Sequence, residues 1–377
     1  MKKLLFVLGS RGEWGYIKPI IKISQEYGFL SEVCATNMML LPKHGDLLKE
    51  IISEGVSVSS KIMSAVSGDS REAMAKSIGL VTQSFADILF SNPPNWVILA
   101  GDRAEQFGAA IASTFMYIPT AHIQAGERSG NIDGVTRHAI TKLTHIHFAS
   151  NSDATERLIR MGEQKFRVIE TGAPQIDSML SVERPTRSHL IKDNYIPKSE
   201  YALVCFHPVT EDYEDLNKQV EFIVNIANST LLPKIWILPN NDAGGELVRD
   251  AILNNKNISD RIFSNIKRET YLSIMEHASI MFGNSSSGIL EAPTFRVPVV
   301  NIGHRQADRI SAKNVIHVDF DKESCEKAIL NALSPEFKES IKQITNPYGD
   351  GSASHKILKS LQEIVVTREL LVKSVAY

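Results

Sequence analysis

Cysteine is scarce in this chain of 377 residues, which contains only Cys34, Cys205 and Cys325. Three cysteines spread over the whole length indicate neither a disulfide framework nor a cysteine metal site. Net charge is small too, because 41 basic residues stand against 43 acidic ones. We therefore expect no nucleic acid and no membrane among its partners. The histidines lack metal-ligand spacing, so we expect no metal.

Long hydrophobic runs are missing as well. No segment approaches the roughly 18 consecutive apolar residues that are needed to cross a bilayer. The first residues, "MKKLLFVLGSRGEWG", contain a short apolar part that is followed by Arg11 and Glu13 rather than by a small-residue cleavage site. We interpret this start as a buried strand and not as a signal peptide. The expected location is the cytoplasm.

The chain does contain a repeated alternation of short apolar segments and longer amphipathic ones. Continuous apolar runs are typical of parallel strands that are buried on both faces. The spacing in residues 71–90 predicts a helix, and residues 354–372 predict one long terminal helix. Alternation at this pitch predicts an α/β fold with doubly wound parallel sheets. We expect strands at residues 4–9, 32–36, 96–101, 120–124, 146–150, 166–172, 201–206, 234–239, 279–283 and 297–303.

The alternation is weakest over residues 176–200, which are polar and contain Pro185 and Pro197. A new series of apolar segments begins directly after them. We therefore predict two Rossmann-like domains, with a linker region between them. The predicted boundaries are 1–175 for the first domain, 176–200 for the linker, 201–357 for the second domain and 358–377 for the terminal helix.

Polar and ionisable residues recur directly after the predicted strands. Ligands of open parallel sheets bind beyond the carboxyl ends of the strands, so these turns predict a site. They are residues 9–11, 101–103, 124–127, 207–208, 240–242 and 283–288.

The turn "GNSSSG" at residues 283–288 joins a strand to a predicted helix. Its amides and hydroxyls suit an anion, although an ordinary serine N-cap would have the same sequence. Arg11, Arg103 and Arg305 also follow strands, and guanidinium groups bind phosphate through two hydrogen bonds. The chain lacks the G-x-x-x-x-G-K-[ST] and G-x-G-x-x-G fingerprints. These features predict a diphosphate site without metal and without a bound cofactor.

Eight motifs together resemble the hydrolysing UDP-sugar 2-epimerases of sialic and legionaminic acid biosynthesis. They occur in the family's order over nearly the whole chain: "GSRGEWGYIKP", "GDRAEQ", "HIQAGERSGNIDGVTRHAITK", "FHPVTED", "PNNDAG", "GNSSSGILEAP", "NIGHRQADR" and "NPYGDG". The resemblance implies a GT-B-like architecture, with the active site in a cleft between two Rossmann-like domains. It also implies a homodimer and a terminal helix that crosses back to the first domain.

The implied reaction has two stages. UDP leaves C1 while the C2 proton is removed, and water then adds to the 2-acetamidoglycal with inversion at C2. The UDP-binding residues implied by the resemblance are Arg11, Arg103, Ile266, Ser285, Ser286, Glu291 and Arg305. The implied catalytic residues are Asp102, Asp133, Arg137 and His207. Asn240 and Asp242 match a turn that lines the sugar. Helix capping is the alternative role of Asp102 and Asp133.

Two positions depart from the family pattern. Gln124 stands where many relatives carry a catalytic glutamate, so we expect it to bind the sugar and expect Glu127, three residues later, to handle a proton. A structural role for Glu127, paired with Arg128 or Arg137, is the alternative. Met39 stands where some relatives carry a histidine. We expect Met39 to contact the sugar, with core packing as the alternative.

The motifs "HIQAGE" and "SGNIDG" resemble those of the family branch that acts on UDP-N,N′-diacetylbacillosamine, so the resemblance implies this substrate rather than UDP-N-acetylglucosamine. Two other functions remain open on the sequence. One is a GT-B glycosyltransferase that uses a UDP-sugar and an acceptor, and the other is a non-catalytic UDP-sugar sensor.

Overall fold

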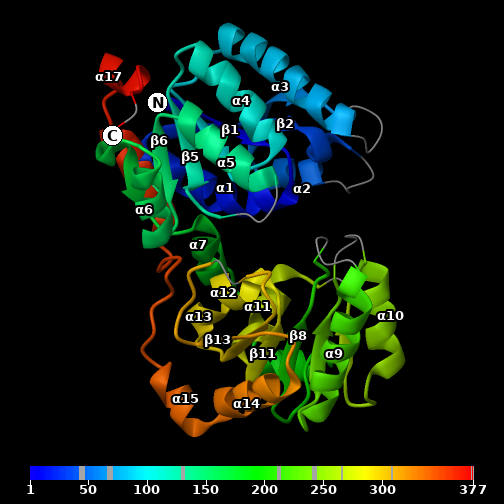
Figure 1. The fold of residues 1–377 in the computed structure, drawn as a ribbon. Helices are drawn as coiled ribbons and strands as arrows, with labels where there is room; N and C mark the ends of the chain where they lie inside the picture. Colours follow the sequence, from blue (N-terminus) through cyan, green and yellow to red (C-terminus); the bar gives the residue numbers. More distant parts are fainter. Residues whose placement is uncertain are drawn as a thin grey trace. The chain divides into compact units, whose positions relative to one another are not determined.

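The computed structural model describes residues 1–41, 47–65, 71–128, 132–209, 214–239, 244–264, 266–306, 309–374 and 376. The chain divides into two units (Figure 1). The first consists of Met1–Leu180 and Tyr348–Tyr377, and the second of Ser181–Pro347. The sequence instead predicts a linker over 176–200 and a second boundary after residue 357. The structure places the boundaries after residues 180 and 347 instead.

The first unit contains a 7-stranded sheet in the order β3-β2-β1-β4-β5-β6-β7. Neighbouring strands pair in parallel. The strands are β1 (Lys2–Leu8), β2 (Phe29–Thr36), β3 (Ser57–Ile62), β4 (Trp96–Ala100), β5 (Thr120–Ala125), β6 (Ile146–Ala149) and β7 (Val168–Glu170). Its helices are α1 (Arg11–Ile23), α2 (Leu47–Ser53), α3 (Arg71–Ser91), α4 (Ala104–Phe115), α5 (Ile132–Leu143), α6 (Ser152–Arg160), α7 (Pro174–Ser181), α16 (Ala353–Glu363) and α17 (Arg368–Leu371), with short 3-10 turns η1 (Ser24–Tyr27), η2 (Asn37–Leu40) and η4 (Lys165–Arg167).

Both faces of this sheet are covered, which explains why its strands are continuously apolar. Leu4 and Phe6 of β1 belong to a core that includes apolar residues of α1 and α16. Leu5 and Val7, which alternate with them, belong to a second core with residues of α3 and α4. Figure 1 shows α3 and α4 on one side of the sheet and α1 on the other. The carboxyl ends of the central strands are left for the turns that carry the predicted site residues.

The second unit contains a 6-stranded parallel sheet in the order β10-β9-β8-β11-β12-β13. Its strands are β8 (Ala202–Cys205), β9 (Lys234–Ile237), β10 (Arg261–Phe263), β11 (Ile280–Gly283), β12 (Val299–Ile302) and β13 (Val315–Val318). Its helices are α8 (Arg187–Lys192), α9 (Leu216–Ser229), α10 (Gly245–Asn255), α11 (Arg268–Glu276), α12 (Ser286–Leu290), α13 (Ala292–Phe295), α14 (Lys322–Leu333) and α15 (Pro335–Ser340). Cores form on both of its faces. The expected α/β fold with two doubly wound parallel sheets is confirmed.

The expected strands are all present, within a few residues of the predicted bounds. Three further strands, β3, β10 and β13, were not predicted, and each lies at the edge of its sheet. The single terminal helix predicted over 354–372 is wrong. The structure has α16 and α17 there, separated by the residues "IVVT". β-Branched residues favour extended backbone, and Thr367 begins α17 as an N-cap because its side chain accepts a hydrogen bond from the amide of Leu370.

The carboxyl-terminal segment is tied to the first unit by buried charges. The fully buried guanidinium of Arg167 donates to the carbonyls of Glu369 (2.7 Å) and Leu370 (2.8 Å). Nζ of Lys373 lies 2.6 Å from the carboxylate of the buried Glu163 and donates to backbone carbonyls at the end of α5. A cation at the carboxyl end of a helix is favoured by the helix dipole. These bonds fix α17 and the residues after it against β6, β7 and α5.

None of the helices formed by the described residues is both long and apolar enough to cross a membrane.

Candidate functional site

Asp102 and Arg137 form an ion pair at the carboxyl end of the first sheet. Asp102 follows β4 and Arg137 lies on α5, and Nη2 of the arginine bonds to Oδ2 of the aspartate. Nη1 of Arg137 also donates to the carbonyl of Gln124 (2.8 Å). The N-cap of α4 is Arg103, so the alternative interpretation of Asp102 as the cap of that helix is wrong. The structure brings two predicted catalytic residues and Gln124 into one hydrogen-bonded cluster.

Gln124 has an unusual backbone conformation. Its φ is +58°, in the left-handed region that is uncommon for a residue with a side chain. Its buried side chain donates through Nε2 to Oε1 of Gln175 on α7 (3.0 Å). Strain of this kind costs on the order of 1–3 kcal/mol and tends to occur at functional sites. The sequence analysis did not identify Gln175, because 51 residues separate the pair and no local spacing points to it.

Glu127 is buried, and its carboxylate accepts a hydrogen bond from the hydroxyl of Ser150, which follows β6. The glycine before it, Gly126, does not serve as a flexible joint. A Cβ at Gly126 would lie 2.5 Å from the carbonyl of Ala154 and 2.7 Å from Cγ of Leu158, both on α6. The glycine is therefore required by close packing against α6, and this packing holds Glu127 in a fixed position.

Glu13 and Glu105 form a pair of buried carboxyl groups on the helices that follow the neighbouring strands β1 and β4. Oε2 of Glu13 accepts from the amides of Gly9 (2.6 Å) and Ser10 (2.8 Å) and forms a capping box at the start of α1. Burial, followed by the nearby charge of Glu105, raises the pKa of Glu13 from 4.5 to about 7. Glu13 was not predicted as a site residue, although the S-x-x-E spacing of a capping box is visible at residues 10–13.

Arg103 and Asn37 reach the same pair of carboxylates. Nε of Arg103 lies 3.5 Å from Oε2 of Glu105, and the side-chain amide of Asn37 donates to its Oε1. Among the described residues, Oε1 of Glu13 and Oε2 of Glu105 have no hydrogen-bond partner. Arg103, one of the predicted UDP-binding residues, places a positive charge beside this pair.

The raised pKa predicts a stabilising substitution, Glu13→Gln. A carboxyl group whose folded pKa is about 7 and whose ordinary pKa is 4.5 contributes stability below pH 4.5 and loses it as the pH rises through 7. Glutamine keeps an acceptor for the two amides and carries no charge. At pH 8 we expect the free energy of unfolding to rise by about 1–3 kcal/mol. At pH 4.5 we expect it to change little.

Urea unfolding of the wild type and of the variant at both pH values measures this effect. Glu156→Gln removes an exposed carboxylate of α6 and serves as the matched control without a pH-dependent gain. Equal destabilisation of Glu13→Gln at pH 4.5 and pH 8 would contradict the prediction.

In the second unit, Asn284 organises the turn after β11. Its Oδ1 accepts from the amide of His207 (2.7 Å), and its Nδ2 donates to the carbonyl of His207 (2.8 Å). Its own carbonyl accepts from Nη1 of Arg305 (3.0 Å). The structure therefore brings together two predicted residues, His207 and Arg305, through a third that sequence analysis did not single out. The signal was present, because Asn284 belongs to the "GNSSSG" motif.

The serines of this turn are linked by hydrogen bonds. Ser285 is the N-cap of α12, and its Oγ accepts from the amide of Ser287 (3.4 Å). Oγ of Ser287 lies 3.0 Å from Oγ of Ser285 and 2.5 Å from the phenol oxygen of Tyr271. Ser286 is half-buried at the first position of α12. The N-cap interpretation of the turn is confirmed for Ser285, and capping leaves the hydroxyl hydrogen of Ser285 available to a ligand.

Glycine at position 283 allows the backbone to turn directly after β11. Its φ is +126°, and a Cβ there would lie 2.1 Å from the carbonyl of Cys205 on β8. Only glycine fits this approach of β11 to β8.

Glu291 and Ile266 complete the described part of the predicted UDP site. The buried Glu291 pairs through Oε1 with Nη2 of Arg268 (2.5 Å), the first residue of α11. Ile266 is half-buried and packs against the core under α11. Both residues therefore lie near the N-terminus of α11.

Four predicted residues lie wholly or partly outside the described residues. Asn240 and Asp242 lie outside, as do the side chains of Arg11 at the start of α1 and of Asp133 in the first turn of α5. Met39, on η2, is 4% exposed and belongs to the apolar core of the first unit. That burial matches the core-packing alternative for Met39.

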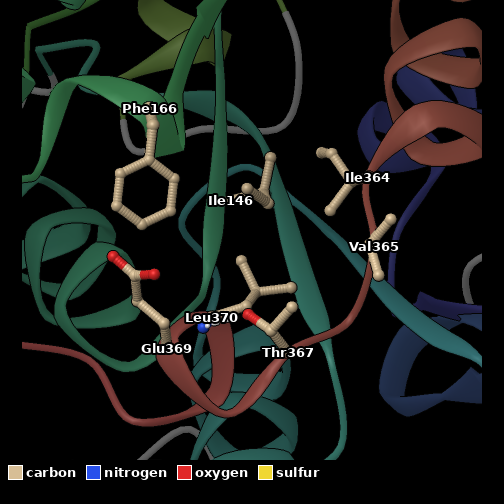
Figure 2. Close-up of a pocket in the computed structure, with 7 residues that line it drawn as sticks. All are labelled: Ile146, Phe166, Ile364, Val365, Thr367, Glu369 and Leu370. Atoms are coloured by element: carbon tan, nitrogen blue, oxygen red, sulfur yellow. Dashed lines mark hydrogen bonds between the residues drawn. The ribbon is translucent and has the colours of Figure 1, made fainter.

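A pocket of about 310 Å³ lies at the carboxyl-terminal segment of the first unit. Figure 2 shows its lining, Ile146, Phe166, Ile364, Val365, Thr367, Glu369 and Leu370. None of the predicted site residues lines it. Its apolar walls and single carboxylate differ from the polar turns at the ends of the strands.

The sequence matches the family model described as UDP-N-acetylglucosamine 2-epimerase over residues 21–362. It is 33% identical, over 100% of both chains, to a Legionella pneumophila protein described as UDP-N,N'-diacetylbacillosamine 2-epimerase (hydrolyzing). It is 30% identical to a Campylobacter jejuni protein described as GDP/UDP-N,N'-diacetylbacillosamine 2-epimerase (hydrolyzing), covering 95% of this chain and 94% of the relative.

The fold is similar to that of a Neisseria meningitidis UDP-GlcNAc 2-epimerase crystallised with UDP-GlcNAc. The TM-score is 0.80 at 22% identity, and the match covers 96% of this chain and 100% of the other. The GT-B-like architecture expected from the motifs is thereby confirmed.

Proposed function

Because the chain belongs to the UDP-N-acetylglucosamine 2-epimerase family, we propose that it is a hydrolysing UDP-sugar 2-epimerase. The observation that carries this proposal is the identity of 33% over the full length of a relative described as hydrolyzing. The hydrogen-bonded clusters at the carboxyl ends of the two sheets support this proposal. They contain groups that can donate hydrogen bonds to an anion and carboxylates that can transfer a proton.

In the proposed reaction, the bond between C1 and the diphosphate oxygen breaks while a base removes the proton from C2. UDP leaves, and a 2-acetamidoglycal remains. Water then adds its hydroxyl to C1, and a proton reaches C2 from the opposite face. The products are UDP and a free 2-acetamido sugar of manno configuration. The C2 proton is weakly acidic, so the reaction needs both stabilisation of the departing charge and a positioned base.

We assign the diphosphate to Ser285, Ser286 and Arg305 of the second unit. Hydroxyl and guanidinium hydrogens are donors, and phosphate oxygens are strong acceptors. The bond from Arg305 to the carbonyl of Asn284 supports this assignment, because it holds the guanidinium beside the serine turn. Glu291 would accept from the ribose hydroxyls, with Ile266 at the nucleoside. Arg11 and Arg103 of the first unit would add positive charge.

We assign the proton transfers to carboxylates and to His207. Asp102 is the leading candidate in the first unit because its ion pair with Arg137 orients the carboxylate. Asp133 and Glu127 are further candidates for the same work. Gln124 would bind the sugar through its amide. Asn240 and Asp242 complete the proposed sugar contacts.

The proposed substrate is UDP-N,N′-diacetylbacillosamine. Both bacillosamine relatives carry that sugar in their descriptions. Kinetics with UDP-N,N′-diacetylbacillosamine and with UDP-N-acetylglucosamine, measured side by side, test the choice. A clear preference for UDP-N-acetylglucosamine would contradict it.

One experiment tests the reaction itself. The protein is incubated with the UDP-sugar in deuterated water, and the products are followed by NMR. We expect free sugar with inverted C2 that carries deuterium at C2. A UDP-linked epimer would indicate the non-hydrolysing reaction. Transfer that occurs only with an added acceptor would indicate a glycosyltransferase, and binding without turnover would indicate a sensor.

The serine turn gives a prediction for binding. Replacing Ser285 and Ser286 together by alanine should weaken UDP binding by about 1–3 kcal/mol, because hydrogen bonds to a charged acceptor are lost. Calorimetric titration with UDP measures the change. Ser334→Ala is the matched control, since Ser334 caps α15 through a bond from the amide of Phe337 (3.1 Å). Unchanged UDP affinity in the double variant would refute the assignment.

We also propose that the protein is a homodimer, as the resemblance implies. Sedimentation velocity at micromolar concentration should give a single species of twice the chain mass. A monomer at that concentration would refute the dimer and leave the proposed reaction untouched.

A further inference from the structure

Tyr271 is a partly buried residue whose phenol touches the serine turn from α11. Its oxygen lies 2.5 Å from Oγ of Ser287 and 3.9 Å from Sγ of Cys205. Ser287 in turn lies 3.0 Å from Ser285, oxygen to oxygen. The hydroxyl groups of Tyr271, Ser287 and Ser285 therefore form a chain of hydrogen bonds. This chain ends at Ser285, the N-cap of α12.

The direction of the first hydrogen bond follows from the neighbours of Tyr271. Burial raises the pKa of Tyr271 well above its usual value, so the phenol keeps its proton. Burial also raises the pKa of Cys205 to about 12. The protonated thiol is a weak acceptor, and its sulfur is the more distant neighbour. Tyr271 therefore donates to Ser287.

The second bond then follows. Oγ of Ser287 accepts from the phenol and directs its own hydrogen to Oγ of Ser285. Ser285 also accepts from the amide of Ser287 at 3.4 Å. A hydroxyl oxygen has two lone pairs, and both lone pairs of Ser285 are occupied in this arrangement. The hydrogen of Ser285 is left to point away from the turn, so the serine can act only as a donor.

We propose that Tyr271 is a positioning residue that fixes Ser285 as a hydrogen-bond donor to a phosphate oxygen of the bound nucleoside diphosphate. The inference rests on the proposed function, because UDP is the proposed ligand of this turn. Without the phenol, Ser287 can rotate its hydrogen away, and Ser285 can then present a lone pair to the phosphate. An oxygen lone pair facing an anion is repulsive, so the serine would contribute less to binding.

Four proteins test this inference: the wild type, Tyr271→Phe, Ser285→Ala and the double variant. Tyr271→Phe removes one oxygen and leaves the ring in place. We expect UDP affinity, measured by calorimetry, to fall about 3- to 10-fold in Tyr271→Phe, the scale of one hydrogen bond. In the Ser285→Ala background the same substitution should change UDP affinity less than 2-fold. Such a double-mutant cycle isolates the coupling of the two residues.

Tyr201→Phe is the matched control for the loss of a buried phenol hydroxyl. Tyr201 is fully buried, and it donates to the carbonyl of Ile274 on the same helix, α11 (2.6 Å). We expect its UDP affinity to equal that of the wild type. Melting temperatures show whether Tyr271→Phe and Tyr201→Phe lose comparable stability, which separates general loosening from an effect on Ser285.

Two results would overturn the inference. One is wild-type UDP affinity in Tyr271→Phe while Ser285→Ala binds weakly. The other is an equal loss on Tyr271→Phe in both backgrounds, which would assign the phenol a structural role independent of Ser285. Failure of the wild type to bind UDP is a different outcome, because it refutes the proposed function itself.

Discussion

Asp102→Asn is expected to lower kcat by a factor of about 10²–10⁴, the range for loss of a group that transfers a proton. The substitution keeps the shape of the side chain but removes its charge and its ability to take a proton. It also leaves the guanidinium of Arg137, which is 6% exposed, without its carboxylate partner. UDP affinity should stay within about 3-fold of the wild type, because the diphosphate is assigned to the second unit.

Steady-state kinetics and UDP calorimetry on the same preparation measure both quantities. The matched control is Glu276→Gln, which breaks another partly exposed carboxylate–arginine pair, with Nε of Arg184 at 2.9 Å. The control should retain kcat. A normal kcat in Asp102→Asn would show that the ion pair with Arg137 is structural.

Glu127→Gln is expected to lower kcat by a factor of about 10² or more, while UDP binding persists. Gln124 cannot exchange a proton, so the chemistry needs another carboxyl group near the end of β5. Glu127 is fixed there by the packing of Gly126 against α6 and by the hydroxyl of Ser150. Both contacts hold the carboxylate in one place, as a positioned acid or base requires.

Ser150→Ala is the companion variant. It removes the hydrogen bond and keeps the carboxylate, so we expect kcat to fall less than about 10-fold. Near-normal turnover in Glu127→Gln would leave Asp102, Asp133 and His207 to carry the proton transfers alone. Equal losses in the two variants would instead assign Glu127 a structural role in the turn after β5.

The sequence predicted the central strands and missed three of the four edge strands, all except β7. Residues 4–8 of β1 and all of β8 are buried on both faces, so these positions are apolar and the pattern is plain. β3 reads "SVSSKI" and alternates between exposed and half-buried positions, since it is paired on one side only. β10 and β13 are also edge strands, and none of their residues is buried. Partly solvated strands are under weaker pressure to be apolar, so their sequences are harder to distinguish from loops.

The same distinction applies to the site. Turns that follow strands could be placed from the sequence because the topology of a parallel sheet brings them to one edge. The hydrogen-bond partners of the residues in those turns could not be predicted, since Gln175, Ser150 and Tyr271 reach them through tertiary packing. Glu13 was also missed, although its capping box is a local pattern that the sequence contains. Sequence motifs thus indicated which turns carry the chemistry, and the structure identified the residues that hold those turns in shape.

The division of the chain has a consequence for the order in which the protein is made. The first unit needs residues 348–374, and the ribosome synthesises the whole of residues 181–347 before them. At bacterial or eukaryotic rates this interval lasts on the order of ten seconds. During that time Arg167 and Glu163 have no carboxyl-terminal partners, and the face of α1 that packs against α16 is uncovered. The second unit, a continuous segment, can close its core in the meantime. The unit that emerges first is therefore the last to be completed.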